Sequence, residues 1–402
     1  MDLKSGYPFW TVKNGLPVHF PPLSKDLDCD VLVIGGGITG ALVAHELAKA
    51  DLDVAVLEKR DAAWGSTAAS TAMLQYEIDT ELVDLAKQYG TRKAVAIYRA
   101  CEKAVLELQP LADGVPGAAY KRVESLYYAS RPWHGGRLRD EGALRRRHGF
   151  DLEILDREAL KDRFNISAAA ALLTKTAAHV DPYRLALGLL QDLRKRGATI
   201  CDRTEVLDWR AGSRGIEVRT DRESIVRCKH LVLAAGYESQ RFLRQKVASN
   251  RSSYALVSEP LRQAPDWLAK TLAWESARPY LYLRMTHDNR LLMGGEDDTV
   301  DIPIKRDAQV MKKSKRILGK VRKLLPDFEL ESGFAWAGTF AETDDGLPFF
   351  GPHEEHGPRV HFAMAYGGNG IAYSRIGAQL LRARIERKAH PLARFLSFER
   401  IN

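Results

Sequence analysis

Three glycines and one glutamate have the residue types and the spacing to hold a dinucleotide. The glycines are Gly35, Gly37 and Gly40, and Glu58 closes the next apolar run of the chain. Gly35 permits a tight turn, Gly37 lets the backbone approach a pyrophosphate, and Gly40 lets a helix pack closely on a sheet. The Glu58 carboxylate can accept hydrogen bonds from both hydroxyls of a ribose, which disfavours a 2′-phosphate.

The segments around these residues predict the strands and the helix that would position them. Val31–Ile34 and Val54–Leu57 are apolar runs typical of buried parallel strands, with a helical pattern between them. Ile38 and Thr39 open this helix, whose free N–H groups and partial positive charge favour a phosphate. Lys59 directly follows the acid. A plain βαβ unit with a glycine-rich turn is the alternative interpretation.

Three later segments predict further backbone contacts with the same ligand. Residues 62–70 are mostly small, so the chain can run close to a ligand there, and a flexible loop is the alternative. Residues 228–237 form an apolar strand that ends in a second turn of small residues. Residues 366–370, Tyr-Gly-Gly-Asn-Gly, precede a helical pattern, which suits the binding of a negative or electron-rich group.

The composition indicates a globular protein of two domains. At 402 residues the chain exceeds one ordinary core, and its hydrophobic and charged fractions, 45% and 28%, are unremarkable for a globular protein. The net charge of +8 is spread along the chain, and its densest cluster, Arg145–Arg147, is short. We therefore interpret the basic excess as a solvated face and expect no nucleic-acid partner.

The sequence also predicts a cytoplasmic location and no metal centre. No apolar run approaches the roughly 18 residues that span a bilayer, and the first residues lack the pattern of a signal peptide. The four cysteines lie far apart without a CxxC pair, which favours free thiols in a reducing cytoplasm over disulfides or zinc. The eleven histidines have no metal-ligand spacing, so we expect no metal site.

Six segments, in their order along the chain, resemble the D-amino acid oxidase superfamily of FAD enzymes. This superfamily includes glycine oxidase, sarcosine oxidase and the gamma-glutamylputrescine oxidoreductases. The segment YLYLR…LLMGGED and the early YPFW resemble the last branch most. The resemblance covers nearly the whole chain and rests on Gly35–Glu58, Gly65–Ser70, Val180–Pro182, Leu231–Gly236, Trp336–Gly351 and Tyr366–Gly377.

The resemblance implies an α/β fold in which a Rossmann-like FAD-binding domain carries an inserted substrate domain. The substrate domain would be of the α+β kind, with an antiparallel sheet. Both domains would be discontinuous in the sequence. The implied ranges are 25–90, 165–245 and 333–402 for the FAD-binding domain, 91–164 and 246–332 for the substrate domain, and 1–24 for an N-terminal arm.

The resemblance also implies which residues hold FAD. Glu58 would bind the adenosine ribose, and the backbone of Val206 would face the adenine. The turn Gly368–Ile371 would place N–H groups near the flavin pyrimidine carbonyl. Sarcosine oxidase carries its flavin-linked cysteine near Ala337, so the resemblance implies non-covalent FAD here. The implied FAD-binding residues are Gly35, Gly37, Ile38, Thr39, Gly40, Glu58, Lys59, Ser66, Thr67, Val206, Ala235, Gly236, Gly338, Gly368, Asn369, Gly370 and Ile371.

The implied chemistry is hydride transfer from a carbon next to nitrogen to flavin N5, giving an imine that water hydrolyses. The substrate would be an amine or an N-substituted amino acid. The carboxylate-binding arginine of glycine oxidase falls on Phe340, and two lysines of sarcosine oxidase fall on Leu292 and Ala372. The electron acceptor is therefore open between oxygen and another acceptor. A 2-hydroxy acid or polyol dehydrogenase, and a flavin-binding sensor or partner protein without turnover, are the alternatives.

Alternation along a predicted hairpin points to the substrate site. It places Tyr280, Tyr282 and Arg284 on one face of the sheet. We predict that they bind the substrate, with Arg284 fixing a carboxylate; an outward face of an ordinary sheet is the alternative. Phe340 and Arg375 are further substrate-binding candidates; a core position is the alternative for Phe340, and stabilisation of the last helix is the alternative for Arg375. The predicted catalytic residues are Arg284, Tyr282 and Asn369.

Overall fold

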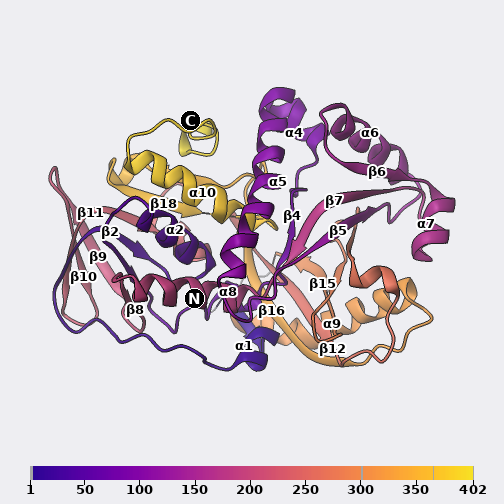
Figure 1. The fold of residues 1–402 in the computed structure, drawn as a ribbon, viewed down its shortest axis with the longest axis horizontal. Coiled ribbons are helices and arrows are strands. Elements are labelled where there is room, and N and C mark those ends of the chain that lie inside the picture. Colours follow the sequence, from indigo (N-terminus) through magenta and orange to yellow (C-terminus); the bar gives the residue numbers. More distant parts are fainter. Residues whose placement is uncertain (1–2, 300–301, 365, 402) are drawn as a thin grey trace.

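The computed structural model describes residues 3–299, 302–364 and 366–401, which fold around two β-sheets. The sheets lie in opposite halves of the molecule, and the long helix α5, Thr91–Asp113, stands between the halves in the view of Figure 1. No helix in these described ranges is long and apolar enough to cross a membrane. The two sheets are therefore the framework on which a site can be built.

The eight-stranded sheet contains the predicted dinucleotide unit. Its strands are β2 Leu27–Ile34, β3 Val54–Leu57, β8 Thr199–Cys201, β9 Val206–Ala211, β10 Ile216–Thr220, β11 Ile225–Leu233, β17 Phe349–Pro352 and β18 Val360–Met364. The main order is β17-β18-β11-β2-β3-β8, and β10 and β9 continue from β11. The strands from β18 to β8 in this order are parallel, as their continuous apolar runs predict.

Three helices pack on this sheet and against one another. They are α2 Ile38–Ala48, α8 Pro182–Lys195 and α10 Gly370–Ile385. Helix α8 has a well-formed start, because Pro182 occupies the first turn and Asp181 Oδ1 accepts the Arg184 N–H at 2.9 Å. Nearly every residue of α2 is buried, so this helix is held by packing on both sides.

The ten-stranded sheet forms the other half. Its strands are β1 Lys4–Gly6, β4 Met73–Gln75, β5 Lys121–Tyr128, β6 Leu152–Leu155, β7 Ala171–His179, β12 Ser249–Ser258, β13 Thr271–Glu275, β14 Tyr282–Met285, β15 Leu291–Asp298 and β16 Ser332–Glu342. The order is β1-β16-β12-β15-β14-β13-β5-β7-β4, and β6 pairs with β7. Every pairing is antiparallel except β13 with β5.

Helix α9, Pro303–Leu324, covers part of the ten-stranded sheet and contacts β1, β12, β15 and β16. It buries an apolar stripe that includes Val310, Ile317 and Val321, while most of its many lysines face away from the sheet. The remaining α-helices are α1 Phe9–Asn14, α3 Ser66–Ala69, α4 Leu82–Tyr89, α6 His134–Arg147 and α7 Arg157–Phe164. The short 3₁₀ helices are η1 Gly236–Phe242, η2 Asp266–Ala269, η3 Glu354–His356 and η4 Phe398–Arg400.

The ten-stranded sheet crosses the predicted domain ranges. Strands β4 and β7, and nearly all of β16, fall in ranges predicted for the FAD-binding domain, yet they pair in this sheet. Helix α5 falls in the predicted substrate range but contacts α10 of the other half. The chain thus passes between the halves several times, so that both can contribute residues to a shared cavity.

Candidate active site

One cavity is lined by residues of both sheets and gathers most of the predicted site. All of the residues predicted to bind FAD line it except Gly40, and so do Tyr280, Tyr282 and Phe340. These residues come from segments spread over more than 300 positions of the chain. We call the part of the cavity beside Glu58 the Glu58 end and the part beside Tyr280 the far end.

The turn from β2 into α2 is built from glycines because side chains would not fit. Gly35 has φ of +111°, and a Cβ there would lie 2.3 Å from the Ala234 carbonyl oxygen. A Cβ on Gly40 would lie 1.8 Å from the Gly35 carbonyl oxygen, so Gly40 acts through packing behind the cavity. The first N–H of the helix, on Ile38, donates to Thr67 Oγ1 at 2.9 Å. The Ile38 N–H is thus already used, while half-buried Gly37 and Thr39 line the cavity, where backbone could approach a pyrophosphate.

Glu58 is held with its carboxylate toward the cavity by two backbone donors. The Gly36 N–H donates to Oε2 at 2.8 Å, and the Arg60 N–H donates to Oε1 at 2.9 Å. Burial raises the pKa of the carboxyl, while these two donors and the neighbouring cations lower it. Each oxygen keeps acceptor capacity beyond its one backbone bond, so a pair of ribose hydroxyls fits here.

Basic side chains gather at this same end of the cavity. Of the described lining residues, the lysines and arginines are Lys59, Arg60 and Arg241. Lys59 and Arg60 both pair with Glu238, which lies in the turn after β11. Arg241 lies 3.5 Å from Glu205, next to the predicted adenine neighbour Val206. Three lining acids, Glu58, Glu205 and Glu238, accompany these three cations, so the charges at this end balance in number.

The glycine turn before α10 is tied to the segment that follows β4. Asn369 Nδ2 donates to the carbonyls of Gln75 and Glu77, each at 2.9 Å. The Gly368 N–H donates to Asp79 Oδ2 at 2.7 Å. The predicted N–H group of Gly368 is thus already used by Asp79, because the segment after β4 folds over this turn. Gly370 and Ile371 still place the first turn of α10 against the cavity.

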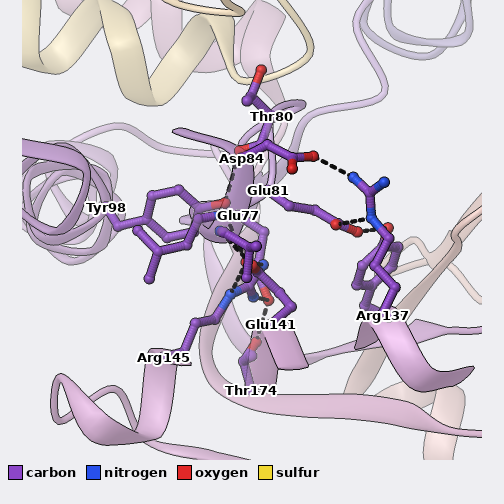
Figure 2. A network of polar contacts seen from close by, with 12 residues as sticks. Glu77, Thr80, Glu81, Asp84, Tyr98, Arg137, Glu141, Arg145 and Thr174 are labelled. Atoms are coloured by element: carbon purple, nitrogen blue, oxygen red, sulfur yellow. Dashed lines mark hydrogen bonds and ion pairs between the residues drawn. The ribbon is translucent and has the colours of Figure 1, made fainter. Parts of the chain in front are cut away.

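A buried polar network fixes the segment that carries Asp79 (Figure 2). Glu77 accepts a hydrogen bond from Thr174 Oγ1 at 2.8 Å and lies 3.5 Å from the fully buried Arg145. The Tyr98 hydroxyl donates to the Thr80 carbonyl at 2.9 Å.

The start of α4, just after Asp79, is held by a second set of contacts. Glu141, which pairs with Arg145, accepts hydrogen bonds from the first two N–H groups of α4. Arg137 forms ion pairs with Glu81 and Asp84. Asp79 is therefore held rigidly at the cavity.

The far end of the cavity has aromatic walls. The Tyr280 hydroxyl donates to Asp79 Oδ1 at 3.3 Å, and the Tyr280 ring lies 5.7 Å from that of Tyr282 and 6.3 Å from that of Trp274, centroid to centroid. Ser253 Oγ lies 3.5 Å from the Tyr282 hydroxyl. Burial raises the pKa of Tyr282 to about 12, so its hydroxyl is protonated at neutral pH.

Asp297, near the end of β15, is the second acid at this end, and the sequence analysis missed both it and Asp79. Burial raises the pKa of its carboxyl to about 6, and the charges of Asp79 and Glu342 act in the same direction. A hydrogen bond with Ser253 and the charge of Arg278 oppose the shift. The buried Oδ1 atom has no hydrogen-bond partner among the described residues.

Arg284, predicted to bind a carboxylate, lies outside the cavity lining. Its side chain is 2% exposed and donates to the carbonyls of Thr71 at 2.8 Å, Val180 at 3.2 Å and Met285 at 3.2 Å. Burial lowers its pKa to about 9. Alternation does place it on the face of Tyr282, but the N-terminal Trp10 and the strand neighbours cover that position. The guanidinium is thus occupied by the protein itself.

Arg375, the other predicted substrate-binding arginine, also lies outside the cavity lining. Its Nη1 lies 2.6 Å from Glu46 of α2, and its Nε lies 3.1 Å from Glu107 of α5. The face of α10 that carries it therefore packs on two helices, which agrees with the alternative that it stabilises the last helix. No arginine that the sequence nominated reaches the substrate end.

Comparison with known proteins identifies the scaffold. The model of the DAO family, FAD dependent oxidoreductase, matches residues 30–384. The chain belongs to this family. FAD is accordingly its cofactor, and the turn at Gly37, the carboxylate of Glu58 and the first turn of α10 fit that group. The predicted superfamily, cofactor and oxidoreductase class are thereby confirmed.

Relatives of this DAO-family chain include several named oxidoreductases. It is 28% identical to glycine oxidase of Geobacillus kaustophilus, over 89% of this chain and 93% of that protein. It is 26% identical to gamma-glutamylputrescine oxidoreductase of Escherichia coli, over 92% and 87%. It is 25% identical to a putative Rieske 2Fe-2S iron-sulfur protein of Bacillus subtilis, over 95% and 73%.

Solved structures confirm the predicted α/β fold class of the DAO-family chain. Glycine oxidase from Geobacillus kaustophilus superposes with a TM-score of 0.75 at 23% identity, covering 92% of this chain and 99% of that one. L-amino acid deaminase from Proteus myxofaciens superposes with a TM-score of 0.80 at 15% identity, covering 100% and 98%. The likeness therefore extends over both sheets.

Proposed function

We propose that this protein oxidises the C–N bond of an amine, with FAD as the hydride acceptor and an imine as the first product. FAD, when bound, supplies the electron-accepting chemistry. The observation that carries the proposal is the continuity of one cavity, which joins the Glu58 end to the end formed by Tyr280, Tyr282 and Asp297. A substrate at the second end would meet the same cofactor that the first end binds.

The residues of the chain would act mainly by orientation and by exclusion of water. Tyr282 and Trp274 are largely buried and form walls that would hold a carbon chain in place. The Asn369 side-chain amide donates to two backbone carbonyls. We therefore propose that Asn369 positions the turn before α10 and does not transfer a proton. Arg284 contacts only protein groups, and we propose no catalytic role for it.

The charge of the far end supports an amine over a phosphorylated or carboxylate-bearing hydroxy compound. The chain is 24% identical to a glycerol 3-phosphate dehydrogenase of Caloramator mitchellensis, over 68% of this chain and 56% of that protein. A phosphate or carboxylate anchor at the far end would require a cation there. The three described cations of the cavity lie at the opposite end, beside Glu205 and Glu238.

Anaerobic reduction of the bound flavin tests the proposal. The FAD-loaded protein is titrated without oxygen with amines, with N-substituted amino acids and with 2-hydroxy acids. Bleaching of the flavin by amines, with aldehyde or ketone released after hydrolysis, is the expected result. Bleaching by hydroxy acids alone would contradict it, and an unreduced flavin in every titration would favour a protein without turnover. Reoxidation by oxygen is then compared with reoxidation by artificial acceptors to identify the acceptor class.

A further inference from the structure

Asp297 is a half-buried residue of the cavity lining, and its carboxylate forms no ion pair with a cation among the described residues. Its Oδ1 atom is buried and has no hydrogen-bond partner among the described residues, and the residue lines the cavity. A buried charge without a partner costs several kcal/mol, so folded proteins rarely keep one that nothing uses. The unpaired carboxylate therefore indicates that a bound ligand supplies the cationic group.

The charges around Asp297 leave this end of the cavity negative. Arg278, whose charge acts on Asp297, lies 3.5 Å from Asp79 Oδ1 and donates to the Asp79 carbonyl, so it is matched to Asp79. Glu342, which also acts on Asp297, has its own partner in Arg251 at 2.8 Å. Asp297 is thus the acid in excess.

Aromatic rings next to this acid add to the preference for a cation. Tyr280 and Tyr282 line the cavity, and the charge of Asp297 acts on both hydroxyls. The faces of such rings attract an ammonium group, and more strongly where water is excluded. Arg278 lies over the Tyr280 ring, 4.7 Å from its centroid, and is not among the residues that line the cavity. A carboxylate and aromatic faces together form the usual surroundings of a bound ammonium.

We infer that Asp297 binds an ammonium group of the substrate and that the far end of the cavity selects cationic amines over substrates whose only charge is a carboxylate. This inference rests on the proposed function and makes its substrate class specific. Asp79 shapes the same end, but its oxygens accept bonds from Gly368 and Tyr280, so it has less capacity left for the substrate. Asp297 is the specificity-determining residue.

Three compounds of one shape test the inference without turnover. tert-Butylammonium has no hydrogen on the carbon next to nitrogen and cannot be oxidised there, while tert-butanol and pivalate offer neutral and anionic counterparts. Each is titrated into the FAD-loaded protein, and the change in flavin absorbance reports binding. We expect tert-butylammonium to bind at least about tenfold more tightly than the other two. We expect Asp297→Asn to remove this preference and to leave tert-butanol binding unchanged.

The neighbouring Asp298 provides a matched control. It lies outside the cavity lining, accepts the Tyr254 hydroxyl at 3.1 Å and pairs with Lys313 at 3.2 Å, so Asp298→Asn removes one charge from the same strand without touching the site. Asp298→Asn should keep the preference, and Asp297→Glu should restore part of it. Flavin content verifies that each variant is folded.

The outcomes separate this inference from the proposed function. Equal binding of the three compounds to the unaltered protein, or an unchanged preference in Asp297→Asn, would overturn the inference even if amines reduce the flavin. An Asp297-dependent preference for tert-butylammonium without reduction by any amine would keep the ammonium site and refute amine oxidation. Where amines do reduce the flavin, Asp297→Asn should raise KM for cationic amines by at least about tenfold and change kcat less.

Discussion

Replacement of Asp297 by asparagine is expected to stabilise the substrate-free protein, and the gain should grow with pH. Burial raises the pKa of this carboxyl from 3.8 to about 6. The folded state therefore holds the proton more tightly than the unfolded state does. As pH rises between the two pKa values, ionisation of this carboxyl lowers the free energy of unfolding by a growing amount. Above about pH 6 this destabilisation levels off.

The size of the effect follows from those two pKa values. Linkage gives a destabilisation of about 1.6 kcal/mol at pH 5 and about 3 kcal/mol at pH 7.5 from this one carboxyl. Asparagine has nearly the same shape and can accept the hydrogen bond that Ser253 gives, but it carries no charge. Asp297→Asn should therefore be more stable than the unaltered protein by an amount that is about 1.4 kcal/mol larger at pH 7.5 than at pH 5.

Urea unfolding of the FAD-loaded protein at pH 5 and pH 7.5, without substrate, measures this difference. Asp298→Asn is again the control, and it should be destabilised at both pH values because it loses the ion pair with Lys313. A gain for Asp297→Asn that is the same at both pH values would refute the reasoning, since it would mean that the carboxyl titrates alike in the folded and unfolded states. So would a loss of stability at pH 7.5.

Three other substitutions separate the cofactor site from the residues around it. Glu58→Gln should weaken FAD binding at least about tenfold, measured by flavin fluorescence titration, because one of the two backbone donors on its oxygens would then face an amide N–H. Gly40→Ala should yield protein with little bound flavin, seen in its absorbance spectrum, since the added Cβ would lie 1.8 Å from the Gly35 carbonyl oxygen. Arg284→Met should lower the melting temperature, because the guanidinium donates to three backbone carbonyls. It should leave kcat and KM, measured per bound flavin, within about twofold of the unaltered protein. A tenfold rise in KM would instead show that Arg284 binds the substrate.

The residues proposed to hold the cofactor could be nominated from the sequence because their pattern is local. The strand β2, the glycine turn and the helix α2 are contiguous, and Glu58 ends the next strand. A Cβ at Gly35 or Gly40 would collide with backbone, so the turn tolerates few other residues and its sequence is diagnostic. The later small-residue segments could be added because each ends a strand or begins a helix at the same edge of the parallel sheet.

The substrate half could not be predicted in the same way, because alternation along a strand gives a face but not what covers it. Arg284 shares its face with Tyr282, yet Trp10, Thr71 and Val180 cover it, and these come from three distant parts of the chain. Asp297 reads in the sequence as an ordinary acid near a strand end. Only the folded chain brings it near Asp79 and leaves it without a cation.

The distribution of charge along the cavity links the two halves. Lys59, Arg60 and Arg241 lie at the end proposed to hold the nucleotide, and the excess acid Asp297 lies at the other. Phe340 also lines the cavity, and it contributes an apolar ring there and no guanidinium. A substrate carboxylate there would lose its hydration without gaining a cation, and it would also be repelled by Asp297. An ammonium group gains from the same carboxylate and from the tyrosine rings. Both effects favour a cationic amine: the far end offers no cation to a carboxylate, and it offers a carboxylate and aromatic rings to an ammonium group.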